Sequence, residues 1–434
     1  MSIDNKNVDT LVVGSGQAGI AMSEHLSQLG IEHLVLEKDR IAEAWRTRRW
    51  DSLVANGPCW HDKFPSMDFP HDPDSFVPHN EVAQYFEDYA KMIAAPIETG
   101  VEVQKIVKNK RQKGFSVTTS QGTLSANNIV VATGPFQQPI IPAIAPQNPS
   151  FYQIHSDQYK NPEQLPEGAV LVVGAGSSGV QIATELNNAG KKVYLSVGPH
   201  ERPPRSYRGR DNVWWLGVLG TWHESTPPQR PIKGFAVSGM NGGQSVDFRK
   251  LGHDGITLVG MTKAFTDSAV TFNDDLVDNV LSAEKNYLTS LDEMDKYIED
   301  NGLDLPEEPE AKVFMDMPEC LNAPTLSLDF DKDNITSVIW ASGFGYDYHW
   351  LDFDIFADNG APIHNRGVTS EPGIYFVGLP YLSGKGSSFI WGVWHDAKRI
   401  AEYIDIQRHY HRYQAADKSD NRTVEVNLAS PAPL

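Results

Sequence analysis

The chain has 434 residues, of which 40% are hydrophobic, with ten Trp, fifteen Tyr and eighteen Phe. This is enough apolar material for about two or three packed domains, so we do not expect the bulk of the chain to be disordered. The net charge of −19 disfavours contact with nucleic acid or an anionic membrane surface. No apolar run approaches the roughly twenty residues of a membrane span.

The cysteine content and the N-terminal residues indicate the cellular compartment to expect. The two cysteines, Cys59 and Cys320, form no Cys-x-x-Cys pair, which excludes a dithiol redox centre and suits a reducing compartment. The N-terminal residues lack the basic and apolar regions of a signal peptide. We therefore expect a cytoplasmic protein.

Residues 8–37 predict a strand, a helix and a second strand, with a glycine-rich turn after the first strand. The turn has the pattern G-x-G-x-x-G, formed by Gly14, Gly16 and Gly19. The first amides of such a helix and its positive end suit a pyrophosphate, and Glu37 at the end of the second strand can accept hydrogen bonds from a ribose. This unit predicts a dinucleotide site, with a plain strand–helix turn as the alternative.

The segment that follows predicts a helix, three strands and a linker. We expect Asn80 to cap a helix over residues 80–95, whose aromatic residues share one face. Strands are expected over 101–107, 114–119 and 127–134. Five closely spaced prolines within 134–149 indicate an interdomain linker.

A second strand–helix–strand unit covers residues 169–197. Its glycines and the two serines that open its helix are Gly174, Gly176, Ser177, Ser178 and Gly179. Ser196 stands where the first unit has Glu37, and the loop that follows contains Arg205 and Arg208. A 2′-phosphate is repelled by a carboxylate and bound by guanidinium groups, so this pattern favours NADPH over NADH. A solvated basic loop is the alternative.

Later segments complete the predicted architecture. They are a long helix over 274–302 that Gly302 ends, buried strands within 335–344 and 373–380, and a closing helix over 387–404. The fold class is α/β, with two Rossmann-like dinucleotide-binding domains. The FAD domain is discontinuous, over 1–165 and 335–414, and the NADPH domain with a helical insertion occupies 166–334. Residues 415–434 are expected to form a flexible tail.

Two dinucleotide sites without a dithiol point to a bound flavin that a nicotinamide reduces. The ordered motifs resemble those of the flavin-containing monooxygenases, including the plant YUCCA-like enzymes and bacterial relatives, over most of 8–404. Besides the two glycine loops these motifs are Ala-Thr-Gly at 132–134, Trp-Ala-Ser-Gly-Phe at 340–344, and Val-Gly-Leu-Pro at 377–380 before a Trp-His-Asp-Ala helix.

The resemblance implies FAD and NADPH as cofactors, and O2 and a small molecule as substrates. A monooxygenase of this kind forms a C4a-(hydro)peroxyflavin and oxygenates a soft nucleophile at nitrogen or sulfur, and oxidation of an indole or a keto acid is also open. An NADPH-dependent flavoprotein reductase or oxidase, and a non-catalytic flavin-binding sensor, are the alternatives. Metal chemistry is not expected, because the fourteen His show no paired ligand spacing. A homodimer stays open.

The resemblance also suggests individual site residues. Asn56, in an Asn-Gly-Pro turn, matches an active-site Asn whose amide hydrogen-bonds the peroxide on the flavin, and an ordinary turn is the alternative. His155 and Tyr159 match half of the family fingerprint, so His155 either takes part in catalysis or orders the linker. Trp45 falls in a segment near the flavin or its entrance. Asp396 is expected at the start of the last helix, which points at the flavin ring.

Overall fold

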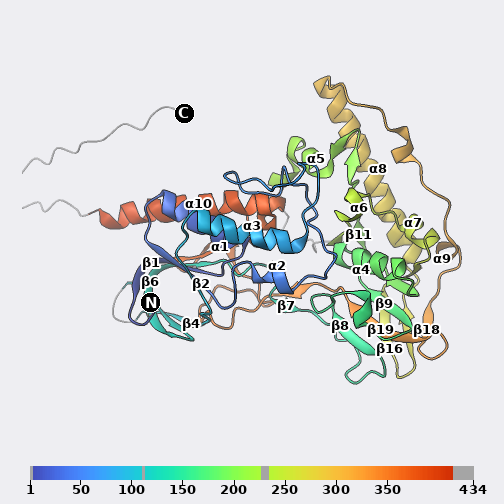
Figure 1. The fold of residues 1–434 in the computed structure, drawn as a ribbon, viewed down its shortest axis with the longest axis horizontal. Coiled ribbons are helices and arrows are strands. Elements are labelled where there is room, and N and C mark those ends of the chain that lie inside the picture. Colours follow the sequence, from blue (N-terminus) through green and yellow to red (C-terminus); the bar gives the residue numbers. More distant parts are fainter. Residues whose placement is uncertain (1–2, 110–112, 226–233, 414–434) are drawn as a thin grey trace, which may run out of the picture.

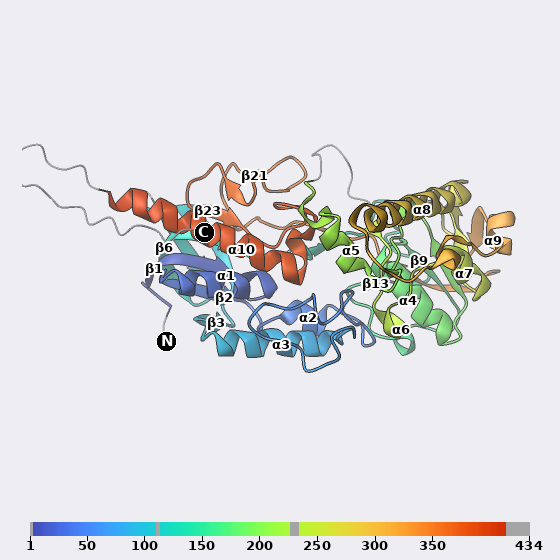
Figure 2. The same ribbon diagram turned by 90° about the horizontal axis from the view of Figure 1, so that it is seen from above.

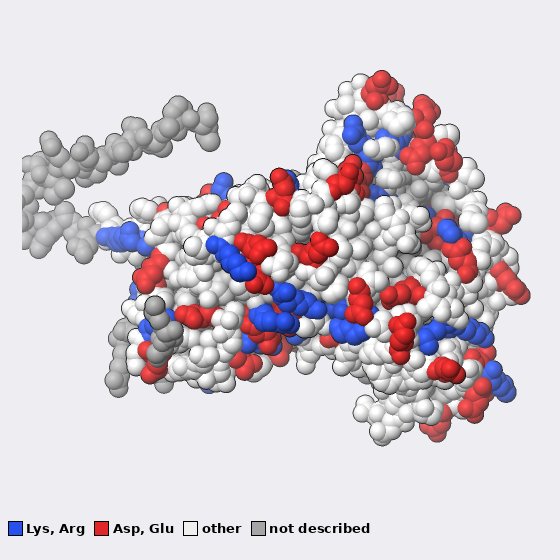
Figure 3. Space-filling view, in the orientation of Figure 1, with Lys and Arg blue, Asp and Glu red and all other residues white. Residues whose placement is uncertain are grey.

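The computed structural model describes residues 3–109, 113–225 and 234–413, and two sheets organise them. Figures 1 and 2 separate the lobe that holds β1, β2 and β6 from the lobe that holds β9 and α8. The expected tail at 415–434 lies outside the described residues. On the face shown in Figure 3, acidic and basic side chains are interspersed over both lobes. Within the described residues, no helix combines the length and the apolar character needed to cross a membrane.

The first sheet has nine strands around a parallel centre in the order β3-β2-β1-β6-β23. The central strands are β1 (Asn7–Val13), β2 (His33–Glu37), β3 (Ile97–Thr99), β6 (Gly122–Val131) and β23 (Ile374–Phe376). Antiparallel strands extend it: β4 (Val103–Lys108), β5 (Phe115–Thr119), β21 (His364–Asn365) and β22 (Val368–Thr369). Helices α1 (Gln17–Gln28), α3 (His79–Met92) and α10 (Ile390–Arg412) lie together over one face (Figure 1).

The second sheet has five parallel strands in the order β15-β10-β9-β19-β8. They are β8 (Tyr152–His155), β9 (Ala169–Val173), β10 (Val193–Ser196), β15 (Thr257–Val259) and β19 (Ile335–Trp340). Its helices include α4 (Ser177–Asn188), α7 (Phe248–His253) and α8 (Leu276–Asn301). A small antiparallel sheet is added by β16 (Thr262–Phe265), β17 (Ala269–Phe272) and β18 (Ser327–Asp329).

Short elements fill the connections. The helices are α2 (Glu43–Thr47), α5 (Asn212–Val218), α6 (Met240–Gly243) and α9 (Glu319–Asn322). The 3-10 turns cover Pro162–Gln164, Thr221–His223, Pro309–Lys312 and Lys385–Ser388. Two-residue strands are β7 (Gln138–Pro139), β11 (His200–Glu201), β12 (Ser206–Tyr207), β13 (Arg210–Asp211), β14 (Gly234–Phe235) and β20 (Phe344–Gly345).

The expected domain boundaries at 165/166 and 334/335 need correction. Strands β8 and β19 lie outside 166–334, yet they pair with each other and β19 pairs with β9, so both belong to the second sheet. The chain crosses between lobes earlier, in the proline-rich segment after residue 134, and returns after Trp340. The outgoing and returning segments pair as β7 and β20.

Local sequence patterns predict several elements correctly, but the starts of two helices differ from the prediction. Helix α8 ends at Gly302, whose φ of 61° is in the left-handed region that favours glycine. Helix α3 begins at His79, and Pro78, not Asn80, occupies its N-cap position. Helix α10 begins at Ile390, so Asp396 lies in its second turn rather than at its start.

Candidate active site

The first glycine of each loop has the same backbone conformation and the same kind of neighbour. Gly14 has φ of 103° and Gly174 has φ of 111°, in the region that side chains rarely adopt. A Cβ on Gly14 would lie 2.8 Å from the carbonyl oxygen of Ala132, and one on Gly174 would lie 2.5 Å from that of Ala341. The Ala-Thr-Gly and Ala-Ser-Gly motifs therefore close the two loops from the neighbouring strands.

The second and third glycines of each loop differ in their surroundings. A Cβ on Gly19 or Gly179 would lie 1.8 Å from the carbonyl oxygen of the first glycine in its loop, so these positions let the helix pack on the strand. A Cβ on Gly16 would meet no atom within 4 Å. Each middle glycine is also the N-cap of its helix, without a side-chain cap. The residues present thus fit two pyrophosphate groups.

The strand ends beyond the two loops differ. The Glu37 carboxylate accepts hydrogen bonds from the backbone amides of Ser15, at 2.8 Å, and Asp39, at 3.0 Å, which hold it beside the first loop. Ser196 donates to the carbonyl oxygen of Gly260 at 3.0 Å and accepts from the amide of Thr262 at 3.0 Å. The second site thus carries a buried hydroxyl where the first carries a carboxylate.

The serines at the second loop are placed as the sequence predicts. Ser177 and Ser178 are the first two residues of α4, directly after Gly176. The Ser177 hydroxyl accepts a hydrogen bond from the backbone amide of Val237 at 3.1 Å.

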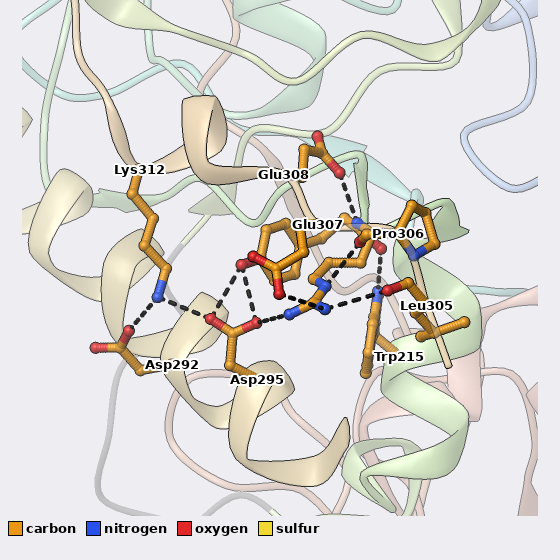
Figure 4. A network of polar contacts seen from close by, with 10 residues as sticks. Trp215, Asp292, Asp295, Leu305, Pro306, Glu307, Glu308 and Lys312 are labelled. Atoms are coloured by element: carbon orange, nitrogen blue, oxygen red, sulfur yellow. Dashed lines mark hydrogen bonds and ion pairs between the residues drawn. The ribbon is translucent and has the colours of Figure 1, made fainter. Parts of the chain in front are cut away.

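The arginines expected to bind a 2′-phosphate are used inside the protein. Arg205 is buried, and its guanidinium pairs with Asp211 at 2.5 Å and donates to the carbonyl oxygen of Asn56 at 2.5 Å. Arg208 pairs with Asp295 of α8 at 2.9 Å and donates to the carbonyl oxygen of Pro306 at 2.8 Å (Figure 4). These partners come from segments that the basic composition of the loop does not reveal, and the role of both arginines as phosphate ligands stays a prediction.

Asn56 lies where the two lobes meet. Its Oδ1 accepts a hydrogen bond from Nε2 of Gln181, in the second turn of α4, at 3.0 Å. Arg205 holds its carbonyl oxygen from the same lobe. No described residue accepts a hydrogen bond from the Nδ2 of Asn56, so this side chain retains a donor for another molecule.

His155 is engaged on both ring nitrogens. Nδ1 contacts the Asp157 carboxylate at 2.9 Å and Nε2 contacts the carbonyl oxygen of Gly343 at 3.0 Å, while the residue is 1% exposed. Phe344 packs edge-on against the ring at 4.9 Å. This geometry favours the second of the two interpretations, in which His155 orders the linker.

Trp45 lies beside the first glycine loop, and Asp396 lies near the start of α10. The Trp45 indole donates to Gln17 Oε1 at 3.3 Å, and Gln17 Nε2 donates to the carbonyl oxygen of Ser388 at 2.9 Å. Trp45 is thereby linked to the first turn of α1 and to the residues before α10. Asp396 is buried and accepts a hydrogen bond from the Ser383 hydroxyl, so it braces the approach to this helix.

The sequence motifs do not reveal an aromatic cluster around His61, a residue close in sequence to Asn56. The His61 ring lies between Trp222 and Trp391, with ring centroids 5.4 Å and 5.6 Å away, and its Nδ1 contacts Asp62 at 2.8 Å. The Trp-His-Asp run that follows Asn-Gly-Pro after Cys59 could have indicated His61. Trp222 could not be found this way, because it lies in an irregular part of the other lobe.

Two glycine loops at helix N-termini, the first beside a carboxylate at the end of the next strand, are typical of flavin-dependent oxidoreductases of the two-domain class. Residues 11–208 match the family described as pyridine nucleotide-disulphide oxidoreductase. Both cysteines of the chain are free. Within the described residues, no group of three or more His, Cys, Asp or Glu is arranged to hold a metal ion.

Comparison with known proteins identifies the family. The chain is 35% identical over 407 residues to an uncharacterized CzcO-like oxidoreductase of Geobacillus kaustophilus (strain HTA426), covering 93% of this chain and 99% of that protein. It is 31% identical over 192 residues to the probable indole-3-pyruvate monooxygenase YUCCA1 of Arabidopsis thaliana, covering 43% of this chain and 46% of that protein. The flavin-containing monooxygenase from Stenotrophomonas maltophilia has a similar fold, with a TM-score of 0.66 and 17% identity over 93% of this chain and 99% of that one. The chain therefore belongs to the family of the CzcO-like oxidoreductases, and it shares its fold with the flavin-containing monooxygenase.

Proposed function

We propose that the protein is an FAD-dependent, NADPH-consuming monooxygenase that transfers one oxygen atom of O2 to a small soft nucleophile. In the balanced reaction NADPH supplies two electrons, one oxygen atom enters the substrate and the other leaves as water. A bound flavin would accept the hydride and pass the electrons to oxygen. The observation that carries the proposal is the pair of glycine loops, each with its middle glycine at the N-cap of a helix that has no side-chain cap.

The residues divide between the two cofactors. Gly14, Gly16, Gly19 and Glu37 would hold FAD, with Trp45 beside them. Five residues of the second loop would hold the nicotinamide dinucleotide: Gly174, Gly176, Ser177, Ser178 and Gly179. The hydroxyl of Ser196, in place of a carboxylate, supports NADPH, since it does not repel a 2′-phosphate.

Asn56 would act at the reacting oxygen. A neutral amide donates a hydrogen bond without transferring a proton, so it can stabilise developing negative charge without discharging it. The free donor is the Nδ2 of Asn56. The relative YUCCA1 is named for indole-3-pyruvate, so indoles and keto acids join amines and sulfides as substrate candidates.

The test follows the fate of labelled oxygen. The protein, loaded with FAD, is given NADPH, ¹⁸O2 and a panel of amines, sulfides, indoles and keto acids, and product mass and peroxide are measured together. We expect one labelled oxygen atom in a product for each NADPH consumed. If every compound leaves all the electrons in hydrogen peroxide or in an added acceptor, the protein is a reductase or an oxidase instead.

A further inference from the structure

Gln181 joins the helix of the second glycine loop to Asn56 in the other lobe. It lies in the second turn of α4, two residues after Gly179, and is 2% exposed. Its Nε2 donates two hydrogen bonds, to Oδ1 of Asn56 at 3.0 Å and to the carbonyl oxygen of Val237 at 2.9 Å.

These two contacts determine which way both amides face. The carbonyl oxygen of Val237 can only accept, so the NH2 group of Gln181 must face it. The same NH2 group faces Asn56, and therefore the Asn56 atom that points to it must be the acceptor, Oδ1. A reversed Gln181 would set its Oε1 against two acceptors and lose both bonds.

The Oε1 of Gln181 itself is buried and has no hydrogen-bond partner among the described residues. The amide is thus held by its donor side alone. Leaving a buried acceptor unpaired is costly, and this indicates that the orientation is set by what Nε2 must contact.

The main chain of Asn56 is held by the same lobe. Arg205 donates to its carbonyl oxygen at 2.5 Å and is itself fixed by Asp211. The side chain and the backbone of Asn56 are therefore both positioned from the lobe that carries the second glycine loop, and Nδ2 is the polar side-chain atom left over.

We propose that Gln181 is a positioning residue that orients the Asn56 amide, so that Nδ2 and not Oδ1 is available to the reacting oxygen. The inference rests on the proposed function of Asn56. It gives α4 a second role, because the helix that would receive the nicotinamide dinucleotide also fixes the donor at the oxygenation site.

Three variants test the proposal. Gln181→Met keeps the volume and removes the donor. Gln181→Glu keeps the shape and reverses the polarity, so that Asn56 must turn its Nδ2 toward residue 181. Ser52→Ala is the matched control, because the Ser52 hydroxyl bonds Glu185 of the same helix at 2.6 Å and thus joins the same two segments without touching Asn56.

The first readout is the fraction of NADPH electrons released as hydrogen peroxide with substrate present. We expect both Gln181 variants to raise this fraction to the level of Asn56→Ala, with the KM for NADPH changed less than about twofold, since one remote hydrogen bond is lost. Ser52→Ala should leave the fraction at the wild-type level. Uncoupling by Asn56→Ala but not by either Gln181 variant overturns the inference alone, whereas no effect of Asn56→Ala overturns the role of Asn56 and the inference with it.

The second readout does not depend on turnover. Denaturant unfolding of the FAD-loaded protein is measured for Gln181→Met, Asn56→Ala and the double variant. The two changes should be non-additive by about tenfold in the unfolding equilibrium constant, because they remove one shared interaction. Ser52→Ala combined with Asn56→Ala should be additive. Additivity in the Gln181 pair would contradict the contact on which the inference stands.

Discussion

An alanine at the middle glycine of the first loop should affect FAD binding much more than it affects folding. A Cβ at Gly16 meets no protein atom within 4 Å, and the φ of −74° suits alanine. We expect Gly16→Ala to lose bound FAD while its unfolding free energy falls by only about 1 kcal/mol, the usual cost of alanine at an N-cap. Flavin absorbance per protein and urea unfolding measure the two effects.

Gly19→Ala is the matched control for this prediction. Its Cβ would lie 1.8 Å from the carbonyl oxygen of Gly14, so helix and strand must separate. This variant should lose about 3 kcal/mol of stability, as expected for overpacking against backbone. A Gly16→Ala protein that retains full flavin would show that no ligand approaches this glycine.

Arg208 offers a second prediction for a single side chain. Because its guanidinium is bonded to Asp295 and to the carbonyl oxygen of Pro306, Arg208→Ala should lower stability by about 1–3 kcal/mol. The KM values for NADPH and NADH should change by the same factor. Kinetics with both nucleotides and denaturant unfolding measure this, with the exposed Arg210→Ala as the control. A KM rise confined to NADPH would instead support Arg208 as a phosphate ligand.

Among the elements, α8 and the acidic segment 303–312 are joined by the charges in Figure 4. Burial raises the pKa of Asp295, but hydrogen bonds from Lys312, Arg208 and Tyr207 outweigh it and hold the pKa below its ordinary value of 3.8. A carboxyl whose pKa is lowered on folding stabilises the protein above the unfolded pKa, and this stabilisation is lost as the pH falls through the folded pKa.

Asp295→Asn should therefore reduce stability near neutral pH, and its difference from the wild type should shrink as the pH falls below about 4. Unfolding at a series of pH values measures the difference. Asp300→Asn on the same helix is the control, since its partner Lys296 is exposed and the pair is worth little. If the Asp295→Asn difference grows toward acid pH, the sign of this argument is wrong.

Elements are predictable where the signal is local. The two strand–helix–strand units and α8 follow from short patterns that end in glycine, so their placement needs no distant contact. The pairing of β8 with β19 joins segments far apart in sequence, and the sequence does not show that both complete the second sheet. Pro78 shows a related limit, because a proline can occupy the N-cap position that the side-chain rule assigns to Asn80.

The candidate site follows the same division. The six loop glycines, Ser177 and Glu37 are recognisable because they lie within the two strand–helix–strand units that the sequence predicts. Contacts across the molecule are not: Arg208 meets Asp295 87 positions away, and Gln181 meets Asn56 125 positions away. A basic loop therefore resembles a phosphate site, while the residue that holds Asn56 carries no signal of its own.

At the scale of the whole molecule, the two lobes are joined by paired linkers and by contacts from α4. Strands β7 and β20 run side by side, and the two ring nitrogens of His155 contact Asp157 and, on the returning segment, Gly343. Ser52 and Asn56 from the first lobe meet Glu185 and Gln181 of α4. These contacts fix how the two lobes sit relative to each other.

The central claim is that the second loop delivers electrons to a flavin on the first, and anaerobic reduction of Gly176→Ala tests it most directly. Gly176 is the N-cap of α4 with a φ of −76°, a conformation that alanine adopts readily, so the variant should fold and retain FAD. A stoichiometric amount of NADPH should bleach the flavin of the wild type and leave that of Gly176→Ala oxidised. Equal bleaching of both proteins would contradict the account, because the nicotinamide would then not use the second glycine loop.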